Sequence, residues 1–228
     1  LAEQAMGPFL HPLEQNMPDK KEIIMRVKES SYAALFEEVW GPGSLDPEQD
    51  VDAAYDKIGL SIASYERSAE VNPFNSKFDD FWRKAKAAGL NVETIGEENL
   101  KSFANMGLDD KELRGLALFN TRGLCSKCHL LSSEGGKPPV FTDYTYDNLG
   151  IPRNPDNPFY KMPAAFNPDG ERWIDRGLGH FLEESDPLRD HAAVNIGKHK
   201  VPTLRNVDLR PSPGFVKAYM HNGFFKSL

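Results

Sequence analysis

The sequence lacks the features that mark several common classes of protein. Its 228 residues include only two cysteines, so the two cysteine pairs of an ordinary structural zinc site are absent. No apolar run approaches the length of a membrane span. The net charge of −7 argues against a nucleic-acid partner. The first residues are already polar and do not resemble a signal peptide, so we expect a mature or trimmed chain.

The two cysteines are informative because of their spacing. They stand three residues apart, as Cys125 and Cys128, and His129 follows directly. A Cys-x-x-Cys-His run is typical of covalent haem c attachment. Two thiols on one helical turn can both reach the vinyl edge of a porphyrin, and the adjacent imidazole can bind its iron. His129 is therefore the predicted metal ligand.

Other interpretations of this motif explain less. A thioredoxin-like redox pair is expected within a βαβ unit, and the sequence shows no such pattern. A simple disulfide would leave the adjacent His129 without a role. Because thioether formation to haem takes place on the exported side of a membrane, the motif also predicts a periplasmic location.

Strand signals are weak throughout, and the sequence predicts an all-α fold with a cytochrome c-like haem domain. We expect residues 1–108 to form one helical segment and residues 109–228 the haem domain. Residues 1–18 are predicted to be irregular, because Gly7-Pro8 and His11-Pro12 interrupt any helix. Helical periodicity is predicted over 19–40, 46–65, 74–88 and 109–119, with a short helix in the connector 90–108.

The later part of the chain differs in character. Residues 132–215 are rich in proline and glycine, which predicts long ordered loops with short helices near 173–182 and 187–194. Loops of this length are uncommon unless they are functional, and a buried porphyrin would supply their apolar contacts. Gly115 lies within a predicted helix, which indicates either a close helix crossing or simple tolerance.

Several further stretches resemble the bacterial di-haem cytochrome c peroxidases and their MauG-type relatives. They occur in the family's order at 1–14, 31–36, 112–116, 141–143, 146–150, 201–206 and 220–223. The resemblance implies a two-haem architecture, in which the motif at Cys125 holds the electron-relaying haem with His129 as proximal ligand. A second haem is then expected from sequence outside this chain or from a companion chain.

The resemblance also implies a site where peroxide reacts. Gln4, Pro8 and Glu14 match the distal wall above the other haem. There a glutamate can move a proton between the peroxide oxygens, and a glutamine can orient peroxide by hydrogen bonds. Proline keeps its backbone nitrogen from donating or ligating.

Other residues are assigned to the haem surroundings through the same resemblance. Arg205 matches a position that can pair with a haem propionate, and His221 one that can donate a further hydrogen bond. The family also holds calcium, partly through main-chain carbonyls that here correspond to Val216 and Ala218. The first haem domain would precede Leu1, and the sixth ligand of the relaying haem would follow Leu228.

Three functions follow from these expectations. The first is a periplasmic di-haem peroxidase, an oxidoreductase that reduces hydrogen peroxide with electrons from a small cytochrome c or copper protein. The second is a MauG-type enzyme that oxidises another protein, and the third is a mono-haem electron-transfer cytochrome. A homodimer and internal sixth ligands, Met162 or Met220, stay open as alternatives.

Overall fold

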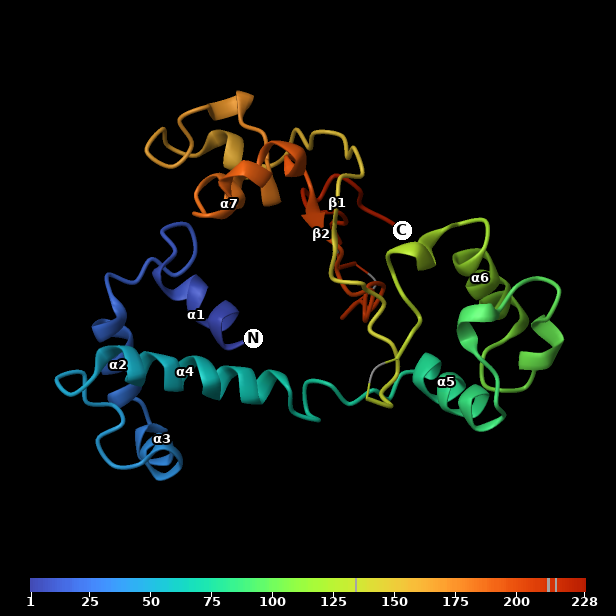
Figure 1. Ribbon diagram of the computed structural model, residues 1–228, viewed down its shortest axis with the longest axis horizontal. Coiled ribbons are helices and arrows are strands. Elements are labelled where there is room, and N and C mark those ends of the chain that lie inside the picture. Colours follow the sequence, from blue (N-terminus) through green and yellow to red (C-terminus); the bar gives the residue numbers. More distant parts are fainter. Residues whose placement is uncertain (134, 213, 216) are drawn as a thin grey trace. The chain divides into compact units, whose positions relative to one another are not determined.

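The chain forms two units, residues 1–73 and residues 74–228 (Figure 1). The computed structural model describes residues 1–133, 135–212, 214–215 and 217–228. This division differs from the predicted one at 108/109, because α5 (Lys77–Ala87) and the turns over 92–103 share a core with α6 (Asp110–Asn120). None of the helices in the described ranges is long and apolar enough to cross a membrane.

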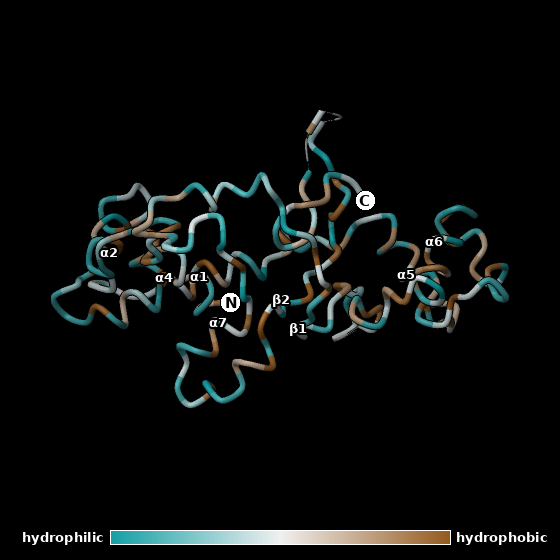
Figure 2. Tube along the Cα trace, turned by 90° about the horizontal axis from the view of Figure 1, so that it is seen from above, coloured by the Kyte–Doolittle hydropathy of each residue, from teal (hydrophilic) through white to brown (hydrophobic). Residues whose placement is uncertain are grey.

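The first unit consists of four helices: α1 (Ala2–Leu10), α2 (Lys20–Lys28), α3 (Ala33–Trp40) and α4 (Val51–Glu66). The apolar face of α4 packs against α1 and α2, and apolar positions gather where these helices run together (Figure 2). The buried residues of this core are Ile23, Ile24, Phe36, Leu45, Ala54, Tyr55 and Ile58. The Asp50 side chain caps α4 by accepting a hydrogen bond from the Ala53 backbone.

The structure corrects three expectations for this unit. Residues 1–18 are not irregular throughout, because α1 continues through Pro8. Packing on α4 stabilises it, and the Tyr55 hydroxyl donates to the Met6 carbonyl at 2.6 Å. The helix predicted over 19–40 is two helices, since the chain turns between Lys28 and Ala33. The helix predicted over 46–65 begins later, at Val51, with Asp50 as its cap.

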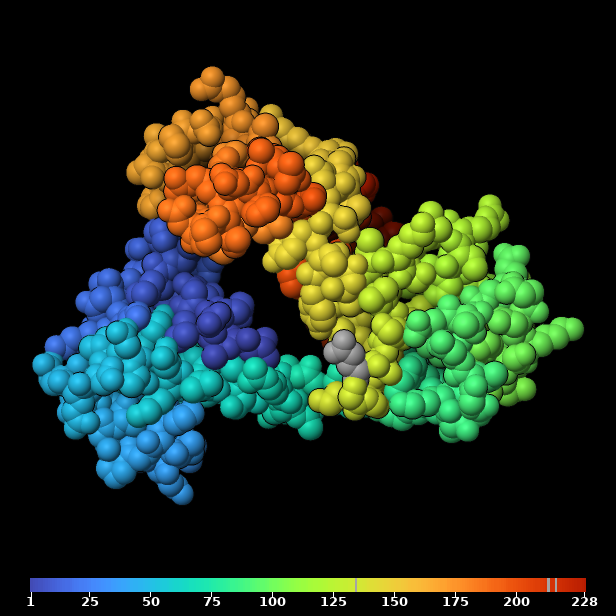
Figure 3. Space-filling view, in the orientation of Figure 1, coloured from blue at the N-terminus to red at the C-terminus, as the bar shows by residue number. Residues whose placement is uncertain are grey.

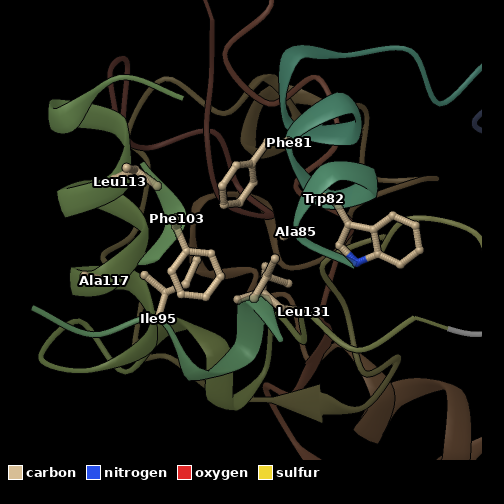
Figure 4. Close-up of a cluster of buried hydrophobic side chains, with 9 residues drawn as sticks. Phe81, Trp82, Ala85, Ile95, Phe103, Leu113, Ala117 and Leu131 are labelled. Atoms are coloured by element: carbon tan, nitrogen blue, oxygen red, sulfur yellow. The ribbon is translucent and has the colours of Figure 1, made fainter. Parts of the chain in front are cut away.

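The second unit begins with α5 (Lys77–Ala87) and α6 (Asp110–Asn120), as the sequence predicts. Each starts with a full capping box, formed by Ser76 with Asp79 and by Asp109 with Glu112. Between them lie the 3₁₀ turns η1 (Val92–Thr94) and η2 (Leu100–Phe103). Apolar side chains of both helices and of the segment between them converge on one core, which Leu131 completes (Figure 4). Its buried residues are Phe81, Trp82, Ala85, Val92, Ile95, Phe103, Leu113, Ala117 and Leu131.

Beyond α6 the chain is mostly ordered loop, as predicted. The helical elements described in this stretch are the short helix α7 (Leu178–Glu183) and several 3₁₀ turns. The strands β1 (Tyr146–Asp147) and β2 (His199–Lys200) form one small antiparallel pair. In Figure 3 the green atoms of this unit lie against the yellow segment that follows them in the sequence. The ring centroids of Phe78 and Phe141 lie 4.9 Å apart. The fold is thus mostly helical with little sheet.

Two mid-helix glycines provide a matched test of helix packing. A Cβ atom on Gly59 of α4 would lie 2.7 Å from Met6 Cγ and 3.0 Å from the Ala2 carbonyl, whereas Gly115 of α6 has open space around it. We expect Gly59→Val to lower the free energy of unfolding by roughly 1–3 kcal/mol through overpacking. Gly115→Val should change it by less than about 0.5 kcal/mol. Urea unfolding of the chain measures both, and equal effects would contradict the close packing of α1 on α4.

Candidate functional site

The Cys-x-x-Cys-His motif forms a tight turn directly after α6. Gly123 donates its backbone N–H to the Leu118 carbonyl at 2.7 Å, and any Cβ there would lie 2.8 Å from the same oxygen. The 3₁₀ turn η3 (Cys125–Lys127) follows, and the His129 backbone N–H donates to the Cys125 carbonyl at 2.9 Å. Both cysteines are unpaired. The helical turn predicted for this motif is therefore present, with both thiols available.

The ring of His129 is fixed by one hydrogen bond. Its Nδ1 atom lies 2.8 Å from the backbone carbonyl oxygen of Phe141. Because a carbonyl can only accept, Nδ1 carries a proton, and in the neutral ring Nε2 keeps its lone pair. A metal-binding histidine typically makes such a hydrogen bond through the ring nitrogen that does not bind the metal. The geometry therefore fits Nε2 of His129 as the ligand of a haem iron.

The environment of Cys128 disfavours a reactive thiolate. Its Sγ atom donates to the Asp147 carboxylate at 3.4 Å. Burial, this hydrogen bond and the negative charges of Asp147 and Asp143 raise the pKa of the Cys128 thiol above its ordinary value. Redox-active and metal-binding cysteines have lowered values instead. The surroundings of Cys128 therefore differ from those of a redox-active cysteine.

The Phe141 carbonyl belongs to a segment that is bonded on both sides to residues 201–205. The Thr142 hydroxyl is buried and donates to the Val201 carbonyl at 2.6 Å. The Thr203 hydroxyl donates to the Val140 carbonyl, also at 2.6 Å. The stretch at 201–206, which the sequence singled out by resemblance, therefore contacts the segment that orients His129.

Arg205 makes a different principal contact from the predicted one. Its guanidinium forms a two-bonded ion pair with Asp79 at 2.9 and 2.8 Å, and it also donates to the Pro139 carbonyl. Asp79 is fully buried. Burial alone would raise the pKa of Asp79, but the hydrogen bonds from Arg205 and Ser76 outweigh it, and that pKa lies below its ordinary value. These contacts occupy four of the five guanidinium N–H groups, so contact with a propionate stays a prediction limited to the fifth.

His221 lies in a cluster that the sequence did not predict. Its ring stacks on that of His199, with centroids 3.6 Å apart and an interplanar angle of 8°. Asp175 completes a group whose candidate ligand atoms all lie within 4.8 Å of one another. Lone pairs of parallel rings run side by side and do not converge, so this arrangement does not present a metal site as it stands. His199 is brought here by long-range pairing, of β1 with β2 and of Gly177 with Lys198, and no local sequence signal marks it.

The three predicted distal residues lie in the first unit. Gln4 and Pro8 are four residues apart on α1 and share one face. Glu14 follows in a turn, where its backbone N–H donates to the His11 carbonyl at 3.1 Å. Its carboxylate is half-exposed and lies 3.8 Å from the His11 ring. Their catalytic role stays a prediction.

An apolar groove of about 1020 Å³ also opens in the first unit. Its walls come from α1 to α4 and include Tyr32, Leu35, Val39 and Tyr65, all exposed. None of the three predicted distal residues lines it. The groove is therefore a separate feature of this unit.

The described residues do not test the expectations for calcium and for the sixth haem ligand. Val216 lies outside the described residues, which leaves Ala218 alone of the two predicted carbonyl positions. Met162 ends the 3₁₀ turn η4 (Pro158–Lys161), and Met220 is exposed with a φ of 64°. Both expectations stay predictions.

Comparison with known proteins gives consistent results. The family model described as di-haem cytochrome c peroxidase matches residues 1–87. The methylamine utilization protein MauG of Paracoccus denitrificans is 30% identical over 230 residues, covering 100% of this chain and 49% of MauG. The cytochrome-c peroxidase IdrP1 of a Pseudomonas species is 26% identical over 178 residues, or 74% of this chain and 37% of that protein.

A solved structure shows the same relationship. The diheme peroxidase BthA of Burkholderia thailandensis matches with a TM-score of 0.70 and 27% identity, over 100% of this chain and 47% of BthA. The chain thus spans about half the length of MauG and of BthA.

The histidine pair should titrate in a way that reveals its neighbours. Partial burial and the charge of His199 lower the pKa of His221, while Asp175 opposes them. As pH falls below about 6.5, the unfolded chain therefore binds more protons at His221 than the folded chain does. Protonation of His221 lowers the stability of the folded chain in that pH range. We expect His199→Gln to raise the pKa of His221 and Asp175→Asn to lower it, by NMR titration. Shifts in the opposite order would contradict the stacked geometry.

Proposed function

Because the chain belongs to the family of di-haem cytochrome c peroxidases and MauG, we propose that it provides the electron-relaying haem domain of a two-haem oxidoreductase that reduces hydrogen peroxide. The observation that carries this proposal is the turn at Cys125 and Cys128, with His129 oriented through the Phe141 carbonyl. The first unit would contribute the distal wall of the other haem pocket.

Each residue of the site has a defined task in this proposal. Cys125 and Cys128 would bind the porphyrin covalently, and Nε2 of His129 would bind its iron. A haem held there supplies reversible one-electron transfer. The carbonyl of Phe141 keeps the imidazole in the tautomer that can ligate. At the other haem, Glu14 would move a proton between the two peroxide oxygens while Gln4 orients the substrate.

The remaining parts of the proposal concern partners and place. Electrons would arrive from a small cytochrome c or a copper protein in the periplasm, where c-type haem is attached. This chain matches about half of MauG and about half of BthA. The second haem would be bound by sequence that corresponds to their other half, or by a companion chain. The similarity to the diheme peroxidase BthA supports the two-haem arrangement.

A MauG-type oxidation of another protein is the second candidate. It is favoured by the match to MauG, which covers the whole chain at 30% identity, whereas the match to IdrP1 covers 74% at 26%. A mono-haem carrier is the third candidate. The number of irons per assembly separates it from the first two, because both enzymes need two haems.

Covalent haem is the first test of the proposal. In full-length protein matured with the c-type haem machinery, intact mass should show covalently bound haem at this site. Cys125→Ala together with Cys128→Ala should abolish that attachment, because no other cysteine is present in this chain. Ser126→Ala, in the same turn, is the matched control and should keep the haem. Free, titratable thiols without Soret absorbance in the unaltered protein would refute the proposal.

The distal role of Glu14 is tested separately. Glu14→Gln should lower the peroxide-dependent oxidation of a reduced donor roughly 100-fold or more, as expected for loss of a general acid–base group. Glu3→Gln, in the first turn of α1, is the matched control and should leave turnover unchanged. Haem content and the absorption spectrum should be the same in both variants. Equal turnover of the two would remove Glu14 from the mechanism.

A further inference from the structure

Phe141 has an unusual backbone conformation at the position where its carbonyl meets His129. Its φ is 56°, in the left-handed region that a bulky side chain rarely adopts. Such a conformation persists only where the surrounding contacts over-determine it. The contacts that hold this residue therefore also determine where its carbonyl points.

Those contacts form a consecutive series along the segment. The Pro139 carbonyl accepts from Arg205 Nε at 3.0 Å and from its Nη2 at 2.6 Å, and the Val140 carbonyl accepts from Thr203. The Phe141 carbonyl accepts from His129, and the Thr142 hydroxyl donates to the Val201 carbonyl. Three of these four residues are thus bonded to the stretch 201–205, and the fourth is bonded to the histidine.

Arg205 is held in place by the buried carboxylate of Asp79. Asp79 belongs to the capping box of α5, so its position is set by a helix that packs in the core of this unit. The guanidinium also lies over the rings of Phe74, at 4.7 Å, and Phe141, at 5.7 Å. The side chain of Arg205 is therefore bonded at its edge and packed on its faces, which leaves it little freedom.

We propose that Asp79, Thr142, Thr203 and Arg205 act together as a carbonyl clamp that positions the Phe141 carbonyl, and through it the imidazole of His129. These four are positioning residues, and Arg205 serves in place of, or in addition to, any contact with a propionate. The proposal rests on the proposed function, because it takes His129 as the ligand of a haem iron.

The expected consequence concerns the electronic character of the ligand. A strong hydrogen bond from Nδ1–H increases the basicity of the imidazole and so favours the oxidised, more positive iron. If the clamp loosens, this bond lengthens and the reduced state is favoured. The midpoint potential of the haem should therefore rise.

The test uses the haem-loaded full-length protein and spectroelectrochemical titration. Arg205→Lys removes the two-bonded pairing, and Thr142→Val removes a buried donor at nearly constant shape. Each should increase the ratio of reduced to oxidised haem at a fixed solution potential by roughly tenfold, the scale of effects from the second layer around a metal ligand. Thr142→Ser keeps the hydroxyl and should restore the original potential.

Asp80→Asn is the matched control. It removes an exposed ion pair with Arg83 on α5, the helix that also carries Asp79. It should leave the midpoint potential of the haem unchanged. If Arg205→Lys and Thr142→Val give the same potential as this control, with haem content intact, the clamp is refuted while the haem assignment stands. Absence of covalent haem from the unaltered protein refutes the proposed function itself. If Arg205→Lys fails to fold, the comparison of Thr142→Val with Thr142→Ser decides.

Discussion

The hydrogen bond from His129 Nδ1 to the Phe141 carbonyl is the contact on which the candidate site of the second unit depends. It fixes the protonated nitrogen and leaves Nε2 free to ligate, so the chemistry of the site follows from the placement of one backbone oxygen. α6 and the turn at Gly123 that follows it place the histidine, and the segment 139–142 places the carbonyl. Neither part can move alone without weakening the bond that joins them.

The buried pair of Asp79 and Arg205 carries out a related task at longer range. Its members are 126 positions apart in the sequence. A fully buried carboxylate is costly unless it is paired, and removing one partner of such a pair typically costs about 3–5 kcal/mol. Because the pKa of Asp79 lies below its ordinary value, this stabilisation is present above about pH 4 and is lost as pH falls through the folded value. The pair favours one register between α5 and the late loop, which is the register that the His129 site requires.

Local signals in the sequence were enough for part of this structure. The capping box at Asp109 and the stripes of α4 and α5 predict helices that are present, and the cysteine spacing predicts the turn. Where tertiary packing overrides local preference, prediction failed: α1 continues through Pro8 because α4 supports it. The partner of Arg205 was missed for a related reason. The local sequence around Asp79 indicates only a helix-capping role, and its ion pair with Arg205 forms only in the folded chain. Residues 201–206 stood out only by resemblance, because their hydrogen bonds reach across the chain.

The loop-rich part of the second unit shows why a large apolar cofactor suits this sequence. Beyond Leu131, the buried apolar side chains of the described residues are few, and they include Leu182, Ala192 and Val201. Other large apolar side chains in the same stretch are exposed, such as Leu149, Phe181 and Leu209. Hydrogen bonds from asparagine, threonine and arginine side chains order these loops, but such bonds add little net stability each. A porphyrin attached at Cys125 and Cys128 would provide apolar surface where the chain has little core of its own. Attachment of haem would then add apolar contacts to loops that hydrogen bonds already order, on the same unit that holds His129.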